Sequence, residues 1–276
     1  MFEKRNILIA TKHQKEQVIA PLLQKYFKMQ ITIATYFDTD NLGTFTGEIE
    51  RKDDPIETLR KKCLGALAET NYDLVIASEG SFGPHPHHFF ATANEEWLML
   101  LDTKNNLEIT VRELTTETNF NGRWIEHLDD LKNFANLVAF PEHRLIIRKH
   151  PEEYHHIHKG IGDYSHLEKI FLELKQTFGK VYVETDMRAM YNPTRMLTIE
   201  KAMQKLVESM QSQCPSCETP GFSIRKTEMG LPCAWCNQPT KSVKYYVKTC
   251  LKCDFEEMKP NLQKREDPAY CDYCNP

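Results

Sequence analysis

Eight of the nine cysteines stand in four Cys-x-x-Cys pairs, all within the last quarter of the chain. Two intervening residues let the backbone turn so that both sulfurs reach one ion, and two such pairs complete a tetrahedral zinc site. The four pairs therefore predict two structural zinc ions, each held by four thiolates. The ligands are Cys214, Cys217, Cys233, Cys236, Cys250, Cys253, Cys271 and Cys274.

The spacing of the pairs leaves their partners open. Gaps of 15, 13 and 17 residues each suit a short hairpin. Either the first pair joins the second and the third joins the fourth, or a cross-braced module joins the first to the third and the second to the fourth. Redox centres, disulfides and iron–sulfur clusters also use such pairs, but four evenly spaced pairs favour zinc. A zinc ion with four cysteine ligands is closed to substrate, so catalysis there is not expected.

A second group of chemically capable residues follows three predicted buried strands. Hydroxyls and lysines ahead of a helix N-terminus suit a phosphate, and carboxylates suit Mg²⁺. We therefore expect a substrate and Mg²⁺ site with Asp38, Asp40 and Glu79 as its catalytic carboxylates. The alternative is that these residues only cap turns or stay solvated. The substrate-binding candidates in this group are Thr11, Lys12, Lys15, Ser78, Gly80 and Ser81.

Charged residues of both signs also precede the last predicted helix. Arg188 and Arg195 could hold a phosphate or carboxylate in a fork, or could join Glu184 and Asp186 in an ion-pair network that fixes this helix. Histidines are a weaker metal candidate at His85, His87 and His88, and residues 154–160 are expected to form a solvated loop. Cys63 is expected to be a buried small apolar group rather than a nucleophile.

Periodicity predicts the elements that position these groups. Asp54-Pro55-Ile56-Glu57 is a strong helix start, with Asp54 as the N-cap. The order strand, helix, strand, helix, strand predicts an α/β fold with a mostly parallel or mixed sheet covered by helices on both faces. Ligands bind such sheets beyond the carboxyl ends of the strands. The expected strands are 6–11, 30–37 and 72–78, and the helices between them are 16–27 and 54–70.

Further elements extend this domain. Residues 96–105 and 107–114 are expected to form an antiparallel pair, residues 144–150 and 181–186 two more strands, and alternating β-rich runs join the cysteine pairs as ribbon strands. Helices are expected at 125–138, 165–178 and 193–211. The chain thus divides into an α/β domain over residues 1–211 and a small two-zinc ribbon-type module over residues 212–276.

Composition narrows the class of protein. Of 276 residues, 41% are hydrophobic and 27% charged, which excludes wholesale disorder. A formal net charge of −4 provides no global field for coating nucleic acid. No run approaches the roughly 18 apolar residues of a membrane span, and the first residues do not look like a secretion signal. We therefore expect a cytoplasmic protein with reduced thiols and no membrane partner.

Three runs carry a resemblance to known families. GTFTGEIER, SEGSFGPHP and ETDMRAMYNPTR, ahead of the cysteine pairs, resemble a bacterial family known only as a domain of unknown function. Residues 6–83 more distantly resemble the nucleoside triphosphate pyrophosphatases of the inosine triphosphatase and Maf type. That second resemblance implies that Thr11 and Lys15 form a phosphate turn, and that Mg²⁺ binds Asp38 or Asp40 together with Glu79 beside Gly80.

Three functions remain open at this point. The first is a Mg²⁺-dependent hydrolase or transferase acting on a nucleotide or another phosphorylated small molecule. The second is an RNA- or tRNA-acting protein in which the zinc module, with Lys244 and Lys248, grips nucleic acid. The third is a non-catalytic nucleotide sensor or adaptor whose zinc module docks a protein.

Overall fold

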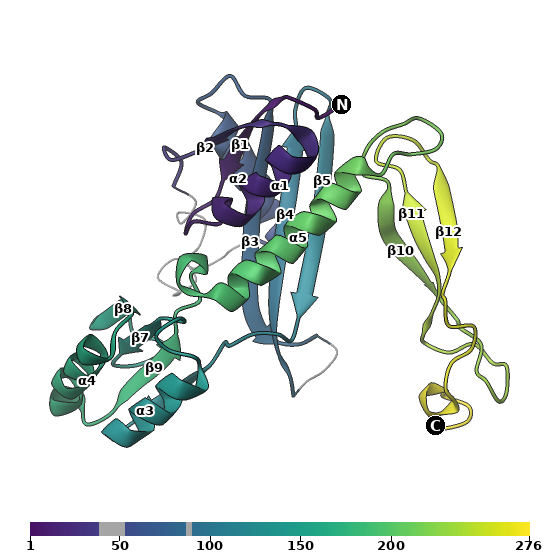
Figure 1. Ribbon diagram of the computed structural model, residues 1–276. Helices are drawn as coiled ribbons and strands as arrows, with labels where there is room; N and C mark the ends of the chain where they lie inside the picture. The colour runs from purple at the N-terminus through teal and green to yellow at the C-terminus, as the bar shows by residue number, and fades with distance from the viewer. Residues whose placement is uncertain (39–52, 87–89) are drawn as a thin grey trace. The chain divides into compact units, whose positions relative to one another are not determined.

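The structure is a computed structural model that describes residues 1–38, 53–86 and 90–276. The chain divides into two compact units (Figure 1). One comprises Phe2–Leu206, and the other comprises Val207–Pro276 together with Met1. The last helix, α5 (Pro193–Gln211), runs through the division between them.

A five-stranded mixed sheet forms the larger part of the first unit. Its strand order is β2-β1-β3-β4-β5; β1 is parallel to β2 and β3, whereas β3, β4 and β5 are antiparallel. The expected α/β class and mixed sheet are therefore confirmed. The strands are β1 (Asn6–Ala10), β2 (Gln30–Ile33), β3 (Leu74–Pro84), β4 (Thr92–Asp102) and β5 (Leu107–Thr115).

Helices cover both faces of this sheet. Helix α2 (Pro55–Leu67) buries Leu59 and Cys63 against one face, so Cys63 is a core residue as expected. Helix α1 (Glu16–Phe27) and α5 lie on the other face. Lys15, the N-cap of α1, donates a hydrogen bond to Ser78 of β3 on that face, and Arg195 of α5 donates to Glu96 of β4. Side chains alternate between the faces along every strand. This alternation decides which residues can share a site.

The predicted start of α2 is confirmed in detail. Asp54 is the N-cap, and its carboxylate accepts hydrogen bonds from the backbone N–H groups of Ile56 at 2.9 Å and Glu57 at 3.0 Å. Pro55 occupies the first helical position, where a missing N–H costs nothing.

Two strand predictions were wrong at their ends. The third strand does not stop at Ser78 but continues as β3 to Pro84, because β4 pairs with it along that whole length. Glu79 to Gly83 are therefore strand residues, not a loop. The second strand was expected to reach Phe37 but ends at Ile33, followed by a turn.

A second sheet, with order β6-β9-β7-β8, is antiparallel throughout. Its helices α3 (Leu128–Leu137) and α4 (Tyr164–Phe178) bury Phe134 and Phe171 in a common core with the strands. The stretch expected to be a solvated loop instead supplies most of an edge strand. The strands are β6 (Gly122–Ile125), β7 (Leu145–Arg148), β8 (Ile157–Ile161) and β9 (Val181–Thr185).

The second unit contains a narrow three-stranded antiparallel ribbon of order β10-β11-β12. Its strands are β10 (Ser223–Met229), β11 (Val243–Thr249) and β12 (Glu256–Pro260), and most of their side chains are exposed or half-buried. The expected ribbon-type module is therefore confirmed. Across the described parts of the chain, none of the helices combines the length and apolar character that crossing a bilayer requires.

Candidate functional site

The eight paired cysteines form two groups of four. Cys214 and Cys217 meet Cys250 and Cys253, while Cys233 and Cys236 meet Cys271 and Cys274. The first pair therefore joins the third and the second joins the fourth, so the module is cross-braced. The sequence spacing left this choice open, and the antiparallel ribbon decides it by bringing the ends of non-adjacent hairpins together.

The sulfur positions fit a metal rather than disulfides. The closest Sγ–Sγ distances across the pairs are 3.5 Å and 3.7 Å in the first group and 3.6 Å and 3.8 Å in the second. A disulfide needs about 2.05 Å, whereas four sulfurs at ~2.3 Å from a tetrahedral zinc ion lie about 3.8 Å apart. Each group can therefore hold one zinc ion.

Backbone N–H groups donate hydrogen bonds to the cysteine sulfurs. The N–H of Trp235 donates to Cys233 Sγ at 3.4 Å, and the N–H of Lys252 donates to Cys250 Sγ at 3.3 Å. Hydrogen bonding with Thr219 lowers the pKa of Cys217 to about 6. Donors of this kind stabilise thiolates, the form that ligates zinc.

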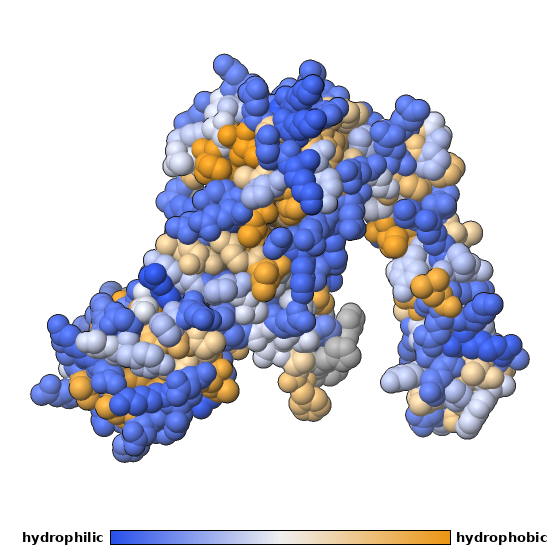
Figure 2. Space-filling model, viewed as in Figure 1, coloured by the Kyte–Doolittle hydropathy of each residue, from blue (hydrophilic) through white to orange (hydrophobic). Residues whose placement is uncertain are grey.

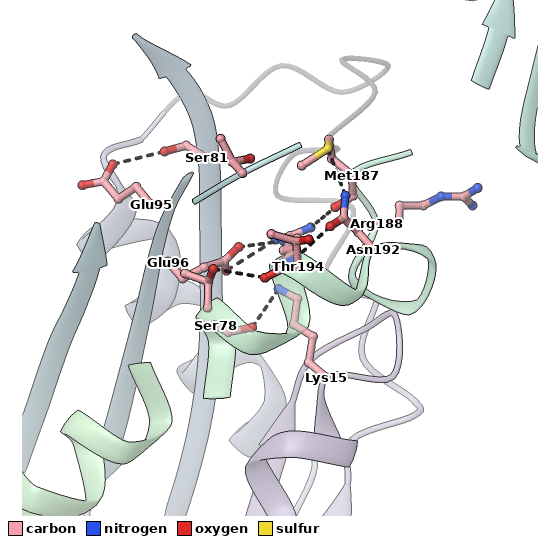
Figure 3. Close-up of polar contacts among 12 residues, drawn as sticks. Lys15, Ser78, Ser81, Glu95, Glu96, Met187, Arg188, Asn192 and Thr194 are labelled. Carbon is pink, nitrogen blue, oxygen red and sulfur yellow. Dashed lines mark hydrogen bonds and ion pairs between the residues drawn. The ribbon is translucent and has the colours of Figure 1, made fainter. Parts of the chain in front are cut away.

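In the first unit, several predicted residues come together where β1 ends beside the middle of β3. The Lys15 ammonium, at the start of α1, donates to Ser78 Oγ on β3 at 2.9 Å. Lys15 is only 4% exposed, and Ser78 and Thr11 are also buried. Figure 3 shows Lys15 reaching Ser78 with Glu96 beside them. Of the residues predicted for this site, Lys15 and Ser78 are thus in contact, and Thr11 is buried directly after β1. Their role in binding a substrate stays a prediction.

A buried ion pair adjoins this cluster. Arg195 Nε donates to Glu96 Oε1 at 2.6 Å, and Arg195 Nη1 donates to the carbonyl of Met187 at 2.5 Å. Both charged side chains are fully buried. A Cβ at Gly80 would lie 2.5 Å from the Glu96 carboxylate and 2.6 Å from Arg195 Nη2, so glycine lets this pair lie directly on β3. Arg195 therefore forms an ion pair, as one of its two alternatives had it, but with Glu96 of β4 rather than with Glu184 or Asp186.

Glu79 and Ser81 point to the opposite face of β3. Glu79 is buried in an ion pair with Lys62 of α2, and Ser81 Oγ donates to Glu95 at 3.1 Å. Because the side chains of a strand alternate, neither residue can join Ser78 on the face of α1. Figure 3 shows the Ser81–Glu95 contact apart from the Lys15–Ser78 contact. The predicted substrate and metal site is thus divided by the sheet itself.

The remaining predicted site residues are held in separate pairs. Asp38 forms an ion pair with Lys12. The Arg188 guanidinium donates two hydrogen bonds to the Asp186 carboxylate, from Nε at 3.0 Å and from Nη2 at 2.6 Å. Glu184 pairs with Arg148 of β7.

Asp40, His87 and His88 lie outside the described residues. Within the described residues, groups of three or more possible metal ligands occur only at the two cysteine tetrads, and the predicted Mg²⁺ carboxylates form no such group.

Sequence reasoning missed Lys62 and Glu96. Glu96 interrupts the apolar run of β4, and Lys62 stands on the apolar face of α2 between Leu59 and Cys63. A charged residue on an otherwise apolar face usually forms a buried ion pair, so the sequence at both positions indicated that such a pair exists. The partner of each could not be read from the sequence.

Burial controls the charge of Lys15. Burial, followed by the repulsion of Arg195, lowers the pKa of Lys15 to about 7. Glu96 and Glu79 favour the charged amine, while Lys62 opposes it. A substantial share of Lys15 is therefore a neutral amine at neutral pH, able to accept a proton.

These features define a mixed α/β protein with a polar strand-end cluster and two cross-braced four-cysteine sites. Residues 62–276 match the family model described as a domain of unknown function, DUF6671, and the chain belongs to this family. No curated protein matches the chain. The expected membership of a family without an assigned function is thus confirmed, whereas the resemblance to nucleoside triphosphate pyrophosphatases stays a prediction.

Cross-bracing can be tested by counting zinc in paired variants. Cys217→Ser with Cys250→Ser damages one site and should leave one zinc ion per chain. Cys217→Ser with Cys236→Ser damages both sites and should leave none. Metal analysis of the purified chains measures both. Sequential pairing would reverse the two results, and a wild-type content other than two zinc ions would contradict the proposed donor sets.

The charge state of Lys15 should appear in the pH dependence of stability. In the folded chain Lys15 loses its proton near pH 7 and in the unfolded chain near the ordinary pKa of 10.5, so unfolding takes up a proton between these values. The free energy of unfolding should therefore rise with pH across this window, by up to about 1.4 kcal/mol per pH unit. Lys15→Met should abolish this rise in denaturant titrations from pH 6 to 10. The same rise in Lys15→Met as in wild type would refute the assignment, and Lys25→Met is the exposed control on α1.

Proposed function

We propose that the first unit binds a nucleotide or another phosphorylated small molecule at the carboxyl end of β1, beside Ser78 of β3, and acts on it as a hydrolase or transferase. The observation that carries this proposal is the buried Lys15–Ser78 contact directly ahead of α1. A lysine and hydroxyl groups at a helix N-terminus favour an anion, because free amides and the helix dipole face it.

Unsatisfied polar atoms support a ligand here. Among the described residues, Thr11 Oγ1 and both amide atoms of Asn94 are buried without a hydrogen-bond partner. Asn94 lies two residues before Glu96 on β4, so its side chain shares the face that carries Glu96. Leaving such groups unpaired costs about 1–3 kcal/mol each, and phosphate or sugar oxygens of a ligand would offset that cost.

The electrostatics favour the same ligand class. The surroundings of Lys15 disfavour its charged form, and Arg195 is the largest charged contributor. A phosphate in this cluster would place negative charge near the fixed positive charge of Arg195, which favours an anion. Magnesium is not part of the proposal, because Asp38 and Glu79 already pair with Lys12 and Lys62.

For the second unit, a separate observation supports recognition of a protein rather than RNA. Trp235, Tyr270 and Tyr273 adjoin the second cysteine group and are 77%, 72% and 67% exposed. Figure 2 shows hydrophobic residues at the surface of this unit between hydrophilic ones. Exposed aromatic side chains are enriched in protein interfaces.

Charge argues against RNA as that partner. Residues 207–276 contain equal numbers of acidic and basic residues, and each four-thiolate zinc site adds a net charge of about −2. Three of the lysines pair with carboxylates, Lys226 with Glu256, Lys241 with Asp272 and Lys259 with Glu257. A phosphate backbone needs an excess of positive charge that this unit does not have.

Ligand binding can be measured directly with inorganic phosphate and with nucleoside mono-, di- and triphosphates. A bound compound should raise the melting temperature, and Lys15→Met or Thr11→Val should weaken its affinity by roughly tenfold or more, about 1.4 kcal/mol. Lys104→Met, in the turn between β4 and β5, is the matched control. Phosphate release should be followed with and without Mg²⁺. If no compound stabilises the chain, or if Lys15→Met binds as wild type does, the proposal fails.

The recognition role has its own test. Wild type should show no salt-dependent binding to single-stranded or transfer RNA, and Lys244→Glu with Lys248→Glu should change nothing. Cross-linking in cell extract should yield a protein adduct that Trp235→Ser with Tyr273→Ser removes and that Leu262→Ser, an exposed apolar control, retains. RNA binding that falls with salt and is lost in the double lysine variant would favour the RNA function instead.

A further inference from the structure

The Lys15–Ser78 contact has the geometry of a nucleophile and its base. The distance of 2.9 Å between Nζ and Oγ lies within the ~2.6–3.2 Å that proton transfer between such groups requires. When Lys15 is charged, its N–H donates to Ser78. When Lys15 is neutral, its lone pair can accept the hydroxyl proton of Ser78 and leave Oγ nucleophilic.

The position of Ser78 in the sheet suits this role. β1 ends at Ala10, which pairs with Ala77, so Ser78 is the first residue of β3 beyond the end of its parallel neighbour. The turn that follows β1 faces Ser78 at this point. Reacting groups of parallel sheets are typically found at such strand ends.

The backbone of that turn is strained in a way that places Lys15. His13 and Gln14 both adopt left-handed conformations, with φ of 63° and 61°. Two successive residues of this kind cost free energy, and such strain concentrates at functional sites. Here the two residues reverse the chain immediately before Lys15, so that its side chain meets Ser78.

We propose that Ser78 is a catalytic nucleophile and Lys15 its general base, so that the reaction passes through a phosphoryl-Ser78 intermediate. The substrate is then a phosphate ester or anhydride, and this part of the inference rests on the proposed function. The pKa of Lys15, lowered to about 7 by burial and Arg195, supports the assignment because it makes the free amine available at neutral pH.

The chemistry balances with water as the sole co-reactant. Ser78 Oγ attacks phosphorus as its proton moves to Lys15 Nζ, and the phosphorus–oxygen bond to the leaving group breaks. The leaving oxygen takes the proton from the Lys15 ammonium. Water then attacks the phosphoryl group, gives one proton to Lys15 and releases phosphate, and Lys15 returns that proton to Ser78. The positive charge of Arg195 near this site stabilises the negative charge that develops on the phosphoryl oxygens.

The other hydroxyl of this strand segment provides a contrast. Ser81 lies on the opposite face of β3 and donates to the Glu95 carboxylate, which also pairs with Arg112. Its hydroxyl contacts an acidic group held by an arginine rather than a lysine amine. Ser81 therefore lies outside the proposed site and serves as the matched control.

A fluorophosphonate probe tests the nucleophile without knowledge of the substrate. Ser78 should displace fluoride and form one covalent phosphonyl adduct per chain, located by peptide mapping. Because the base must be neutral, the labelling rate should rise with pH through about 7, in a site whose charged neighbours are Arg195, Glu96, Lys62 and Glu79. Lys15→Arg keeps a positive charge but cannot accept the proton, so labelling should fall by about 100-fold or more.

The controls separate loss of chemistry from loss of fold. Ser78→Ala should abolish the adduct, whereas Ser81→Ala should be labelled as fast as wild type, and melting temperatures show that each variant is folded. If Lys15→Arg does not fold, Lys15→Met provides the same loss of the base. No adduct at Ser78, an adduct elsewhere, or a rate unchanged in the Lys15 variants would overturn the assignment. Phosphate-ligand binding that persists without labelling would leave the proposed binding function standing and remove only the nucleophile.

Discussion

The buried ion pair between Arg195 and Glu96 is the contact on which the first unit depends. It joins β4 of the five-stranded sheet to the first turn of α5, and Arg195 also holds the carbonyl of Met187, which follows β9 of the second sheet. Removing one partner of such a pair costs about 3–5 kcal/mol, because the other charge is left buried without compensation. The bare backbone at Gly80 is the condition that lets the pair pack this closely.

This pair also shapes the chemistry of its surroundings. Arg195 places a fixed positive charge near Lys15, where burial already disfavours the ammonium form. A lysine held neutral can act as a base, whereas an ordinary exposed lysine at the same pH cannot. Arg195 therefore both positions α5 and helps to lower the pKa of the Lys15 amine, whereas its partner Glu96 raises that pKa.

The second unit depends on a different source of folding free energy. Its ribbon leaves most side chains exposed, so apolar burial alone provides little folding free energy. Binding of two zinc ions would supply most of the folding free energy of this unit. The ligands of each site come from hairpins far apart in the sequence, so each ion would hold two hairpins together. Cross-bracing interleaves the two sites, and loss of either one therefore loosens the chain around the other. Aromatic side chains beside the second site, those of Trp235, Tyr270 and Tyr273, remain largely exposed.

The sequence by itself determined the elements whose signals are local. The cysteine pairs, the capped start of α2 and the bounds of α1 and α5 all follow from spacing, caps and periodicity. It also predicted that Lys15 lies near Ser78, and these two residues are in contact where β1 ends beside β3. Glu79 is the exception: it was expected just beyond the third strand, in one site with Ser78, but pairing with β4 extends the strand and turns the two side chains to opposite faces. Only the tertiary structure could decide that, along with the partners of Glu96 and Lys62 and the choice of cross-bracing. Strand pairing, burial and the approach of distant ligands are long-range contacts, and the residues that make them are not neighbours in the chain.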